Sequence, residues 1–554
     1  MTDREDTRGA SFGIAALALV ASITSLTNGF ALDDLPIVAL DPRAHNLADA
    51  WRFCCTSYWP RGYGGGLYRP LTSMLFAVEW AIGHGAPIVF HAINIGLYAV
   101  LAVAVLALAR EVLDPAPAAL AAVLFAVHPA HVEVVANVVG QSELVAALAM
   151  TVAVTVYLRA RRASDAPLGR GLLGGMGALF AAAILAKEHG VVLPLVLLAA
   201  ECTVVRDPRP VRMRARTLWP LAATLVAVGL GYGVARLGAI GWLFGDTPNP
   251  ALASLPPSAR GWTMLAVAGQ WLRLLLWPAH LAALYGPPGT PILKGFDWRA
   301  MGSAVAVGAV LVLAIVARRR VPVITFGVLW AGLALLPVTN LVFVSGVHLA
   351  ERSLFFPSIG AMLSVGGAVS VAQRRWIRVA SMAMASVLVC LGVWRSANRQ
   401  PVWRDNRTLL MQAVQDEPNS YVAHYQLAGQ LFADGLAEAG EREVNVAIAQ
   451  SNGFPPALAM LAQARARNGD CASAVPLWRR ALAQFPRMVP DRLGLATCLL
   501  EVGDYAGARS VAVVGVSEGA WVHTFRVVIA SADSAAATAA DRSVAVTPPA
   551  TPRP

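Results

Sequence analysis

The stretch Gly29-Phe-Ala-Leu-Asp-Asp-Leu-Pro-Ile-Val38 places two adjacent carboxylates, Asp33 and Asp34, directly after the apolar segment 11–30. About 20 apolar residues are enough for a helix to cross a bilayer. No clean Ala-x-Ala cleavage site precedes the two acids, so we expect an uncleaved membrane span rather than a signal peptide. Ionisable side chains at a membrane are costly and usually functional. The stretch therefore predicts a membrane fold and marks one functional site within it.

The composition of the whole chain agrees with a membrane fold. Of the 554 residues, 57% are hydrophobic and 14% are charged, which is too apolar for an ordinary soluble protein. The net charge is +11, but most arginines lie in short clusters between apolar runs, without the interleaved aromatic residues of single-strand nucleic-acid binders. We therefore expect an integral membrane protein and no nucleic-acid partner. The six cysteines include no CxxC motif, so no zinc site is indicated.

Apolar runs of helix length recur up to about residue 400. Because a span needs about 17 to 25 residues, we expect about 11 spans, of which the third and the fifth are short. The spans are predicted at 11–30, 88–109, 116–130, 140–158, 171–186, 190–205, 217–238, 301–317, 322–342, 353–371 and 378–396. The apolar segment 262–284 contains Gln270, Arg273 and three tryptophans, a pattern typical of a helix at the membrane interface, so it is not counted.

The arginine clusters predict the orientation, because positively charged loops stay on the cytoplasmic side. With the tail 1–10 in the cytoplasm, five clusters fall on that side if 262–284 does not cross the membrane. These clusters are Arg110; Arg159, Arg161, Arg162 and Arg170; Arg206, Arg209, Arg212, Arg214 and Arg216; Arg318, Arg319 and Arg320; and Arg374, Arg375 and Arg378. The membrane domain then covers 11–397, and everything after Val393 lies outside the cytoplasm.

The segment 398–520 has a different character. It repeats with a period of 34 residues, the signature of tetratricopeptide repeats, and three repeats are predicted at 419–452, 453–486 and 487–520. The matching positions are Leu427, Leu461 and Leu495; Ala428, Ala462 and Ala496; and Gly435, Gly469 and Gly503. Cys471 and Cys498 could pair outside the cytoplasm, but we interpret them as two small core residues. The tail 521–554, rich in Ala, Ser, Thr and Pro, is expected to be disordered. The predicted fold class is therefore all-α: a helix bundle in the membrane, then an α-solenoid.

Several outer segments carry acids and bases. The outer loop 31–87 is the longest between spans and contains Arg69 within Tyr68-Arg-Pro70. Later outer segments add His128, His131, Glu133, Glu143, Lys187, Glu188, His189, Glu351 and Arg352. Each group alone is a weak signal. Their convergence at one membrane face predicts a functional site there.

These groups also have ordinary structural explanations. The pair Asp33-Asp34 would serve equally to cap the following segment or to mark the water boundary. Histidines such as His128 and His131 at a helix end are more often satisfied by the backbone, and with Glu133 they do not form a recognised zinc spacing. The neighbours Lys187-Glu188 and Glu351-Arg352 would neutralise each other as readily as they would bind phosphate.

Short motifs follow one another in a fixed order along the chain. They are Asp33-Asp34, Tyr68-Arg-Pro-Leu-Thr72, His91-Ala-Ile-Asn94, Leu124-Phe-Ala-Val-His-Pro-Ala-His-Val-Glu133, Val139-Gly-Gln-Ser-Glu-Leu144, Ala186-Lys-Glu-His-Gly190, Leu274-Leu-Leu-Trp-Pro278 and Leu349-Ala-Glu-Arg-Ser-Leu-Phe-Phe-Pro-Ser358. With the trailing repeats, the series resembles the transmembrane and tetratricopeptide-repeat-containing family over nearly all of residues 12–520. The resemblance implies the GT-C fold of protein O-mannosyltransferases and a polyprenyl-phosphate sugar as donor.

The chain departs from this family in three places. Gly140-Gln-Ser-Glu143 stands where the family usually has Gly-Arg-Ala-Asp, and His189 stands where it tends to have Gln. The segment Ala282-Ala-Leu-Tyr-Gly286 lacks an acid that the family would have there. The high Ala, Arg and Gly content looks bacterial. We therefore expect a short bacterial version in the inner membrane, with its repeats in the periplasm.

The resemblance and the charges together predict a mechanism. The enzyme would move a mannose-like sugar to an acceptor hydroxyl of a protein or glycan, for which the repeats would supply a binding surface, with inversion at the outer face. Asp33 or Asp34 would be the general base. The leaving phosphate would be bound by Arg69, Lys187, His189 and Arg352. Supporting roles in orienting cations or binding sugar fall to Glu143, Glu188, Glu351, His128, His131 and Glu133. No metal or other cofactor is expected, because a lipid phosphate carries less charge than a nucleotide diphosphate.

Two other functions fit a membrane domain with repeats. A non-enzymatic scaffold would use the spans as an anchor and the repeats to recruit partners, but it would need no clusters of acids and bases on one face. A transporter of lipid-linked sugar would place charges near the bilayer midplane and show repeated spans. Here the charges lie at span ends, so the glycosyltransferase is favoured.

Overall fold

The computed structural model describes residues 2–60, 63, 66–163, 168–243, 252, 255–287, 289–342, 344–345, 348–371 and 375–545. These residues form helices and connecting segments without a β-strand, so the predicted all-α fold class is confirmed. The chain divides into two compact units. Unit 1 comprises Met1–Tyr285 and Thr290–Gln412, and unit 2 comprises Gly286–Gly289 and Ala413–Pro554. Gly64 and Gly65 of the outer loop and Arg374 of the last arginine cluster lie outside the described residues.

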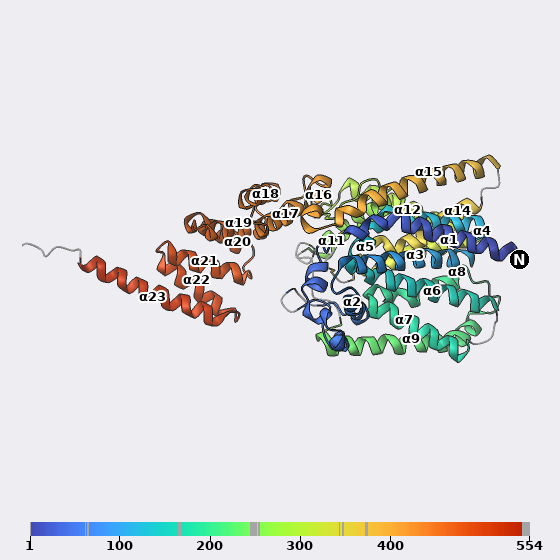
Figure 1. The fold of residues 1–554 in the computed structure, drawn as a ribbon, viewed down its shortest axis with the longest axis horizontal. Coiled ribbons are helices and arrows are strands. Elements are labelled where there is room, and N and C mark those ends of the chain that lie inside the picture. Colours follow the sequence, from blue (N-terminus) through green and yellow to red (C-terminus); the bar gives the residue numbers. More distant parts are fainter. Residues whose placement is uncertain are drawn as a thin grey trace, which may run out of the picture. The chain divides into compact units, whose positions relative to one another are not determined.

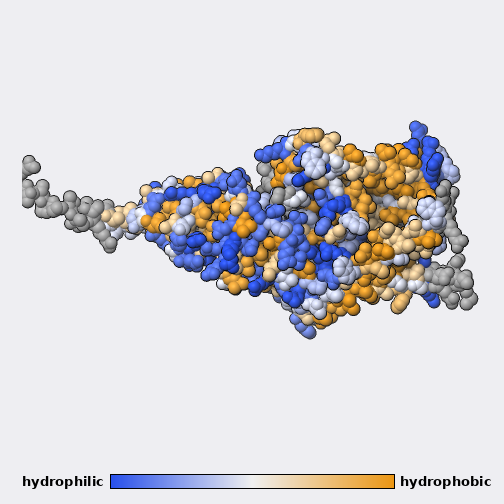
Figure 2. All heavy atoms as spheres, turned by 90° about the horizontal axis from the view of Figure 1, so that it is seen from above, coloured by the Kyte–Doolittle hydropathy of each residue, from blue (hydrophilic) through white to orange (hydrophobic). Residues whose placement is uncertain are grey.

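Unit 1 is a helix bundle. Its long helices run along one common direction, and the amino terminus lies at one end of the bundle (Figure 1). The helices are α1 (Thr2–Ser22), α2 (Pro70–Gly83), α3 (Pro87–Arg110), α4 (Pro115–Ala126), α5 (Val132–Ala136), α6 (Gln141–Ala163), α7 (Arg170–Ala186), α8 (Leu193–Thr203), α9 (Val211–Ile240), α11 (Pro257–Leu276), α12 (Trp298–Ala317), α13 (Pro322–Leu335), α14 (Phe355–Ser370) and α15 (Arg375–Arg399). Hydrophobic residues cover a broad part of the surface of this unit, as Figure 2 shows in orange.

Each of the eleven predicted spans coincides with a helix, but fewer are long enough to cross a membrane alone. Within the described residues, seven helices pass on length and composition, or up to eight if the pair Pro115–Ala126 and Pro129–Ala136, bent by 48°, is one span. The seven are Arg8–Thr27, Pro87–Arg110, Val138–Ala163, Val211–Ile240, Trp298–Ala317, Glu351–Ser370 and Val379–Trp403. Counted by helix length and composition, the predicted number of 11 spans is therefore too high. Runs such as 190–205 are broken by turns, which leave helices too short to cross alone.

Close helix packing in unit 1 depends on small residues. Helices α13 and α14 cross where Gly327 and Gly360 face each other, and a side chain on Gly327 would collide with the carbonyl oxygen of Gly360. Such small-residue crossings are typical of membrane helices, because lipid offers no hydrophobic driving force between them. The aromatic residues Phe125, Phe326 and Phe355 fill the bundle nearby and are fully buried.

Unit 2 is built from helix pairs. The pairs are α17 (Tyr421–Ala433) with α18 (Ala437–Gln450), α19 (Pro455–Arg467) with α20 (Cys471–Gln484), and α21 (Val489–Glu501) with α22 (Tyr505–Ser517). Each predicted repeat contains one pair. The repeated alanines Ala428, Ala462 and Ala496 are fully buried between helices. The repeated glycines have positive φ angles of 77°, 78° and 83°, which glycine adopts without a steric penalty at the turn inside each pair.

The tail differs from the prediction. Residues Val522–Ala545 form helix α23, whereas 521–554 were expected to be disordered. Phe525, Val528 and Ala532 recur at helical spacing and are buried against the last repeat, and the Ala-rich composition hid this apolar stripe. Residues 546–554 lie outside the described part of the chain.

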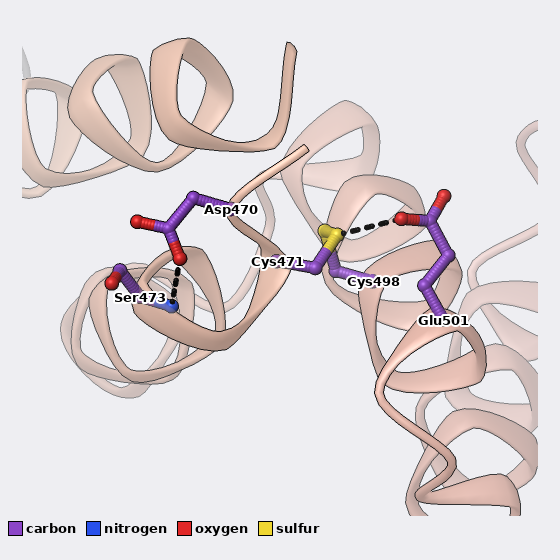
Figure 3. The surroundings of a disulfide bond; sticks show 5 residues. All are labelled: Asp470, Cys471, Ser473, Cys498 and Glu501. Carbon is purple, nitrogen blue, oxygen red and sulfur yellow. Dashed lines mark hydrogen bonds between the residues drawn. A yellow bond between two sulfur atoms is a disulfide. The ribbon is translucent and has the colours of Figure 1, made fainter. Parts of the chain in front are cut away.

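The two repeat cysteines also differ from the prediction. Cys471, at the start of α20, and Cys498, in α21, form a disulfide with a Cα–Cα distance of 5.0 Å (Figure 3). Beside it, Asp470 accepts the Ser473 N–H at 3.1 Å, and Glu501 Oε2 lies 3.2 Å from Cys471 Sγ. The separation of 27 residues did not reveal that the two side chains face each other. The bond joins the second repeat to the third.

Candidate active site

The turn that carries Asp33 and Asp34 follows the first span. Hydrogen bonds hold it to residues 400–406, which are among the last residues of unit 1 in the sequence. The Asn28 side chain donates to the Gln400 carbonyl at 2.9 Å, and the Gly29 N–H donates to the Arg404 carbonyl at 2.9 Å. The Leu32 N–H donates to Asn406 Oδ1 at 2.5 Å. Leu32 has a φ of 47°, an uncommon conformation for a residue with a side chain. The chain around 400–406 therefore fixes an otherwise unfavourable turn.

Asp34 is fully buried and belongs to the framework. Its carboxylate accepts three backbone N–H groups, from Val139 at 2.8 Å, Val138 at 3.2 Å and Ala31 at 3.3 Å. Burial raises the pKa of Asp34 to about 7, and the three N–H groups oppose this rise. Asp34 thus ties its own turn to the segment that leads into α6.

Asp33 is different, although it is the next residue. Its side chain is partly exposed, and it forms no hydrogen bond or ion pair with the residues that the structure describes. Its negative charge acts on Arg352 and on the Tyr58 phenol, so it lies among the other groups of the predicted site. Of the two adjacent acids, Asp33 is the one that remains available for chemistry.

Three ion pairs bring distant segments of unit 1 together. Arg69 Nε donates to Glu188 Oε2 at 2.8 Å. Arg352 contacts Glu133 twice, through its backbone N–H at 2.8 Å and through Nη1 at 2.7 Å. Lys187 donates to the buried carboxylate of Glu143. Lys187 also interacts electrostatically with both arginines and with the other two acids, so the three pairs form one cluster.

These partners differ from the neighbours that the sequence suggested. Lys187 is paired with Glu143 and not with Glu188, and Arg352 is paired with Glu133 and not with Glu351. The interpretation of adjacent residues as neutralised pairs is therefore wrong. Each cation of the cluster is held by an acid from another segment.

Arg69 and Arg352 keep part of their hydrogen-bonding capacity. Arg69 uses Nε for Glu188, and Arg352 uses Nη1 for Glu133. Apart from the contact of Arg69 with the Tyr58 phenol, their remaining guanidinium nitrogens donate to none of the described residues. A guanidinium that is oriented by one carboxylate and has free N–H groups suits an anionic oxygen ligand.

Lys187 and His189 are less suited to that role. Burial, together with the positive charges of Arg69 and Arg352, lowers the pKa of Lys187 well below its usual range. Burial and the nearby cations likewise hold the pKa of His189 well below its usual range, so its imidazole is neutral. The His189 ring stacks on Phe356 with centroids 5.9 Å apart. His189 is therefore less suited than the two arginines to balance the charge of a phosphate.

The remaining predicted residues have partners typical of structural positions. His128 Nε2 lies 3.1 Å from the Leu275 carbonyl, and its Nδ1 accepts the Ala130 N–H at 3.3 Å. The two ring nitrogens of His131 lie 2.9 Å from the Tyr98 hydroxyl and 2.8 Å from the Ser358 hydroxyl. Both histidines thus follow the ordinary explanation of satisfied core residues.

Glu351 is also a framework residue. It accepts the Ala282 N–H at 2.7 Å and the Tyr285 hydroxyl at 2.8 Å, so it holds the segment after α11. Across the described residues, the one group of three potential metal ligands with close ligand atoms is Cys471, Cys498 and Glu501, and its two sulfurs are bonded to each other.

Two residues near the cluster were missed from the sequence. Arg236 in α9 is buried, lies 3.6 Å from Glu188 Oε1 and donates to the Gly66 carbonyl. A charged residue inside the apolar run 217–238 was the signal that could have identified it. Tyr58 is buried next to Arg69, whose guanidinium lies 5.0 Å from the ring centroid. No local pattern distinguishes Tyr58 from the other aromatic residues of the outer loop.

No protein-family model matches the chain, but several known proteins with similar sequences are described as protein O-mannosyl-transferases. Protein O-mannosyl-transferase Tmtc3 of Drosophila melanogaster is 27% identical over 415 residues, covering 63% of this chain and 44% of that protein. Protein O-mannosyl-transferase TMTC4 of Homo sapiens is 27% identical over 493 residues, covering 77% of this chain and 64% of that protein. The chain thus spans 44% to 64% of the length of these two relatives. Among solved structures, the oligosaccharyltransferase of Archaeoglobus fulgidus matches with a TM-score of 0.43 and 15% identity over 76% of this chain and 57% of that chain.

Proposed function

We propose, on the premise that this chain is related to the transmembrane and tetratricopeptide-repeat-containing O-mannosyltransferases, that it is a membrane glycosyltransferase. It moves a mannose-like sugar from a polyprenyl-phosphate donor to an acceptor hydroxyl of a protein or glycan. One observation carries the proposal: the free carboxylate of Asp33 lies within electrostatic reach of Arg352, in a cluster where each arginine is oriented by its own acid.

The groups of the cluster suit a single displacement at the anomeric carbon. The acceptor oxygen forms a bond to this carbon while the bond from the carbon to the phosphate oxygen breaks, and the configuration inverts. Asp33 takes the proton of the acceptor hydroxyl, which contributes roughly 10²- to 10⁴-fold in rate. The phosphate leaves with the bonding electron pair, and the free N–H groups of Arg69 and Arg352 stabilise its charge.

The acids that hold the arginines prepare the site for this step. Glu188 and Glu133 fix the two guanidinium groups before substrate arrives, so little reorganisation is needed when charge develops on the phosphate. Glu143 and Lys187 form the buried centre of the cluster. Asp34 holds the turn on which Asp33 stands.

The position of the cluster supports a lipid-linked donor. A polyprenyl chain stays in the bilayer, so a site that uses it has to lie where spans meet water. Asp33 follows the span Arg8–Thr27 closely, and Glu143 and Arg352 lie within the first turns of two other candidate spans. We place the cluster on the outer face, with the amino terminus in the cytoplasm and the repeats in the periplasm, where they would bind the acceptor.

The test uses purified protein in detergent or nanodiscs with polyprenyl-phosphate mannose carrying a radiolabelled sugar. Release of polyprenyl phosphate and loss of label from the lipid are measured for the wild type, Asp33→Asn and the matched control Asp49→Asn, an exposed acid of the same loop. We expect turnover in the wild type and the control, and loss of turnover in Asp33→Asn. A folded Asp33→Asn variant with full activity would contradict the assigned base.

The same assay separates the alternatives. A scaffold would neither bind nor consume the lipid donor. A transporter would move the lipid-linked sugar across a proteoliposome membrane without cleaving it, and labelled lipid would then be recovered intact on the other side.

A further inference from the structure

Tyr58 lies in the outer loop between the short helix Leu47–Cys55 and α2, and its position is fixed from both sides. Its N–H donates to the Leu67 carbonyl at 2.9 Å, and its carbonyl accepts from Arg43 Nη2 at 3.4 Å. The ring packs in a cluster that includes Phe76, Phe90 and Val138, and the residue is only 3% exposed. The phenol therefore has one well-defined place in the structure.

The Tyr58 hydroxyl is buried, and its proton has no hydrogen-bond acceptor among the residues that the structure describes; the neighbouring Arg69 guanidinium acts on the phenol oxygen only as a donor. Other buried phenols of unit 1 have partners: the Tyr68 hydroxyl donates to the Cys54 carbonyl at 2.8 Å, and the Tyr98 hydroxyl donates to the Phe125 carbonyl at 2.9 Å. A buried polar group without a partner costs about 1–3 kcal/mol, so such a group in a native structure calls for a reason. A bound ligand that supplies the missing acceptor is one such reason.

The surroundings of Tyr58 indicate what kind of ligand fits. The Arg69 guanidinium lies 5.0 Å from the centroid of its ring, and the charge of Asp33 also acts on it. Burial is the main cause that raises the pKa of the Tyr58 phenol above its usual range, so the group stays protonated and acts as a donor. A neutral donor beside a guanidinium with free N–H groups matches an anionic oxygen, because a hydrogen bond to an ionised acceptor is about twice as strong as a neutral one.

We propose that the Tyr58 hydroxyl is a catalytic residue that donates a hydrogen bond to a non-bridging phosphate oxygen of the lipid-phosphate sugar, beside Arg69. This inference rests on the proposed function, since it names a contact within the same site. The hydrogen bond strengthens as negative charge moves onto the leaving phosphate, so it lowers the barrier of the displacement and also holds the phosphate product.

The first test is Tyr58→Phe, which removes only the hydroxyl. Because the proton of that hydroxyl has no acceptor in the described protein, we expect an unchanged or slightly raised melting temperature, together with a fall in kcat/KM of roughly 10²-fold. The matched control is Tyr63→Phe, which removes an exposed hydroxyl of the same loop and should change neither quantity. A lowered melting temperature for Tyr58→Phe would mean that the hydroxyl has a structural partner, and that result would overturn the inference.

The second test measures binding without turnover. Affinity for a short-chain polyprenyl phosphate and for the uncharged polyprenol is determined with the wild type and with Tyr58→Phe. We expect the variant to lose about tenfold or more in affinity for the phosphate and nothing for the alcohol. An unchanged affinity of Tyr58→Phe for polyprenyl phosphate would overturn the assigned contact. This holds even if the KM of the variant for the sugar donor rises.

The two measurements distinguish the failure of this inference from the failure of the proposed function. A wild type that turns over the donor beside an equally active Tyr58→Phe refutes the role of Tyr58 alone. A wild type that turns over no polyprenyl-phosphate sugar refutes the proposed function, while a selective loss of phosphate binding in Tyr58→Phe would still support the contact.

Discussion

The carboxylate of Asp34 accepts the backbone N–H of Val139 at 2.8 Å, across 105 residues of sequence. This bond, with those from Val138 and Ala31, engages both oxygens of Asp34. The adjacent Asp33 has no such partner in the described part of the chain. Two acids that look equivalent in the sequence therefore have separate tasks, one in the framework and one facing the site.

Asp33→Asn and Asp34→Asn are expected to fail in different ways. Asp33→Asn should fold as the wild type does and lose roughly 10²- to 10⁴-fold in turnover, because it removes only the proposed base. Asp34→Asn turns an amide N–H toward backbone N–H donors, so it should lose about 1–3 kcal/mol of stability. Melting temperature and turnover are measured on the same preparations. A destabilised Asp33→Asn beside a stable, inactive Asp34→Asn would reverse the assignment.

Asn406 is expected to position the catalytic turn. Asn406→Ala removes the acceptor of the Leu32 N–H, and Leu32 then has less to hold its left-handed conformation. Because a small displacement of a catalytic group costs up to about 10²-fold, kcat should fall between about 10- and 100-fold with little change in KM. Asn406→Asp keeps the acceptor oxygen and should restore most of the activity. Equal losses for both variants would argue against this role.

Arg69 and Glu188 should behave as a coupled pair. Removing either partner leaves a partly buried charge, so Arg69→Gln and Glu188→Gln should each destabilise the protein by about 1–3 kcal/mol. The double variant should be more stable than the sum of the two changes predicts, since no uncompensated charge remains from this pair. All three variants should lose turnover. Additive destabilisation in thermal unfolding would show that the ion pair does not form.

Glu79 should make the stability of the wild type depend on pH. Burial raises the pKa of Glu79 from its usual 4.5 to about 8, and one of its oxygens accepts the Gln141 amide. The folded protein keeps the Glu79 proton to a higher pH than the unfolded chain does. The contribution of this protonation to the free energy of unfolding is therefore complete below about pH 4.5 and is lost as the pH rises through 8. Glu79→Gln stays neutral, and its amide faces the otherwise unpartnered Gln141 Oε1. The variant should match the wild type at pH 5 and melt higher at pH 9; parallel pH profiles would contradict a protonated Glu79.

The disulfide between Cys471 and Cys498 reports both stability and compartment. Disulfides persist in oxidising compartments, so a periplasmic location predicts that both thiols are protected from alkylation in intact cells. Replacing both cysteines with serine should destabilise the repeats by about 3 kcal/mol, because the bond closes a loop of about 27 residues. Cys54 and Cys55 are exposed free thiols of the outer loop and serve as internal controls. Alkylation of Cys471 and Cys498 in freshly lysed cells would contradict the predicted location.

Much of the fold could be predicted because its signals are local. Apolar runs of helix length mark eleven helices of the bundle, although not the short helices α2 and α5, and the 34-residue period marks the helix pairs through Ala428 and Gly435, whose burial and backbone angle recur in every repeat. The predicted number of spans was too high, because a run such as 116–130 is interrupted between α4 and the short helix Pro129–His131, and composition alone does not reveal this break.

The sequence by itself determined which segments would supply charged groups to the site, since acids and bases at span ends are recognisable from hydropathy and charge alone. Only the tertiary structure decided their partners: Lys187 pairs with Glu143 rather than with its neighbour, Asp34 is buried while Asp33 is partly exposed, and Tyr58 lies beside Arg69. Partner choice depends on which helices pack together and on how far each side chain is buried. The ion pairs of the cluster join residues up to 219 positions apart, as in Glu133 and Arg352, and no local pattern in the sequence predicts them.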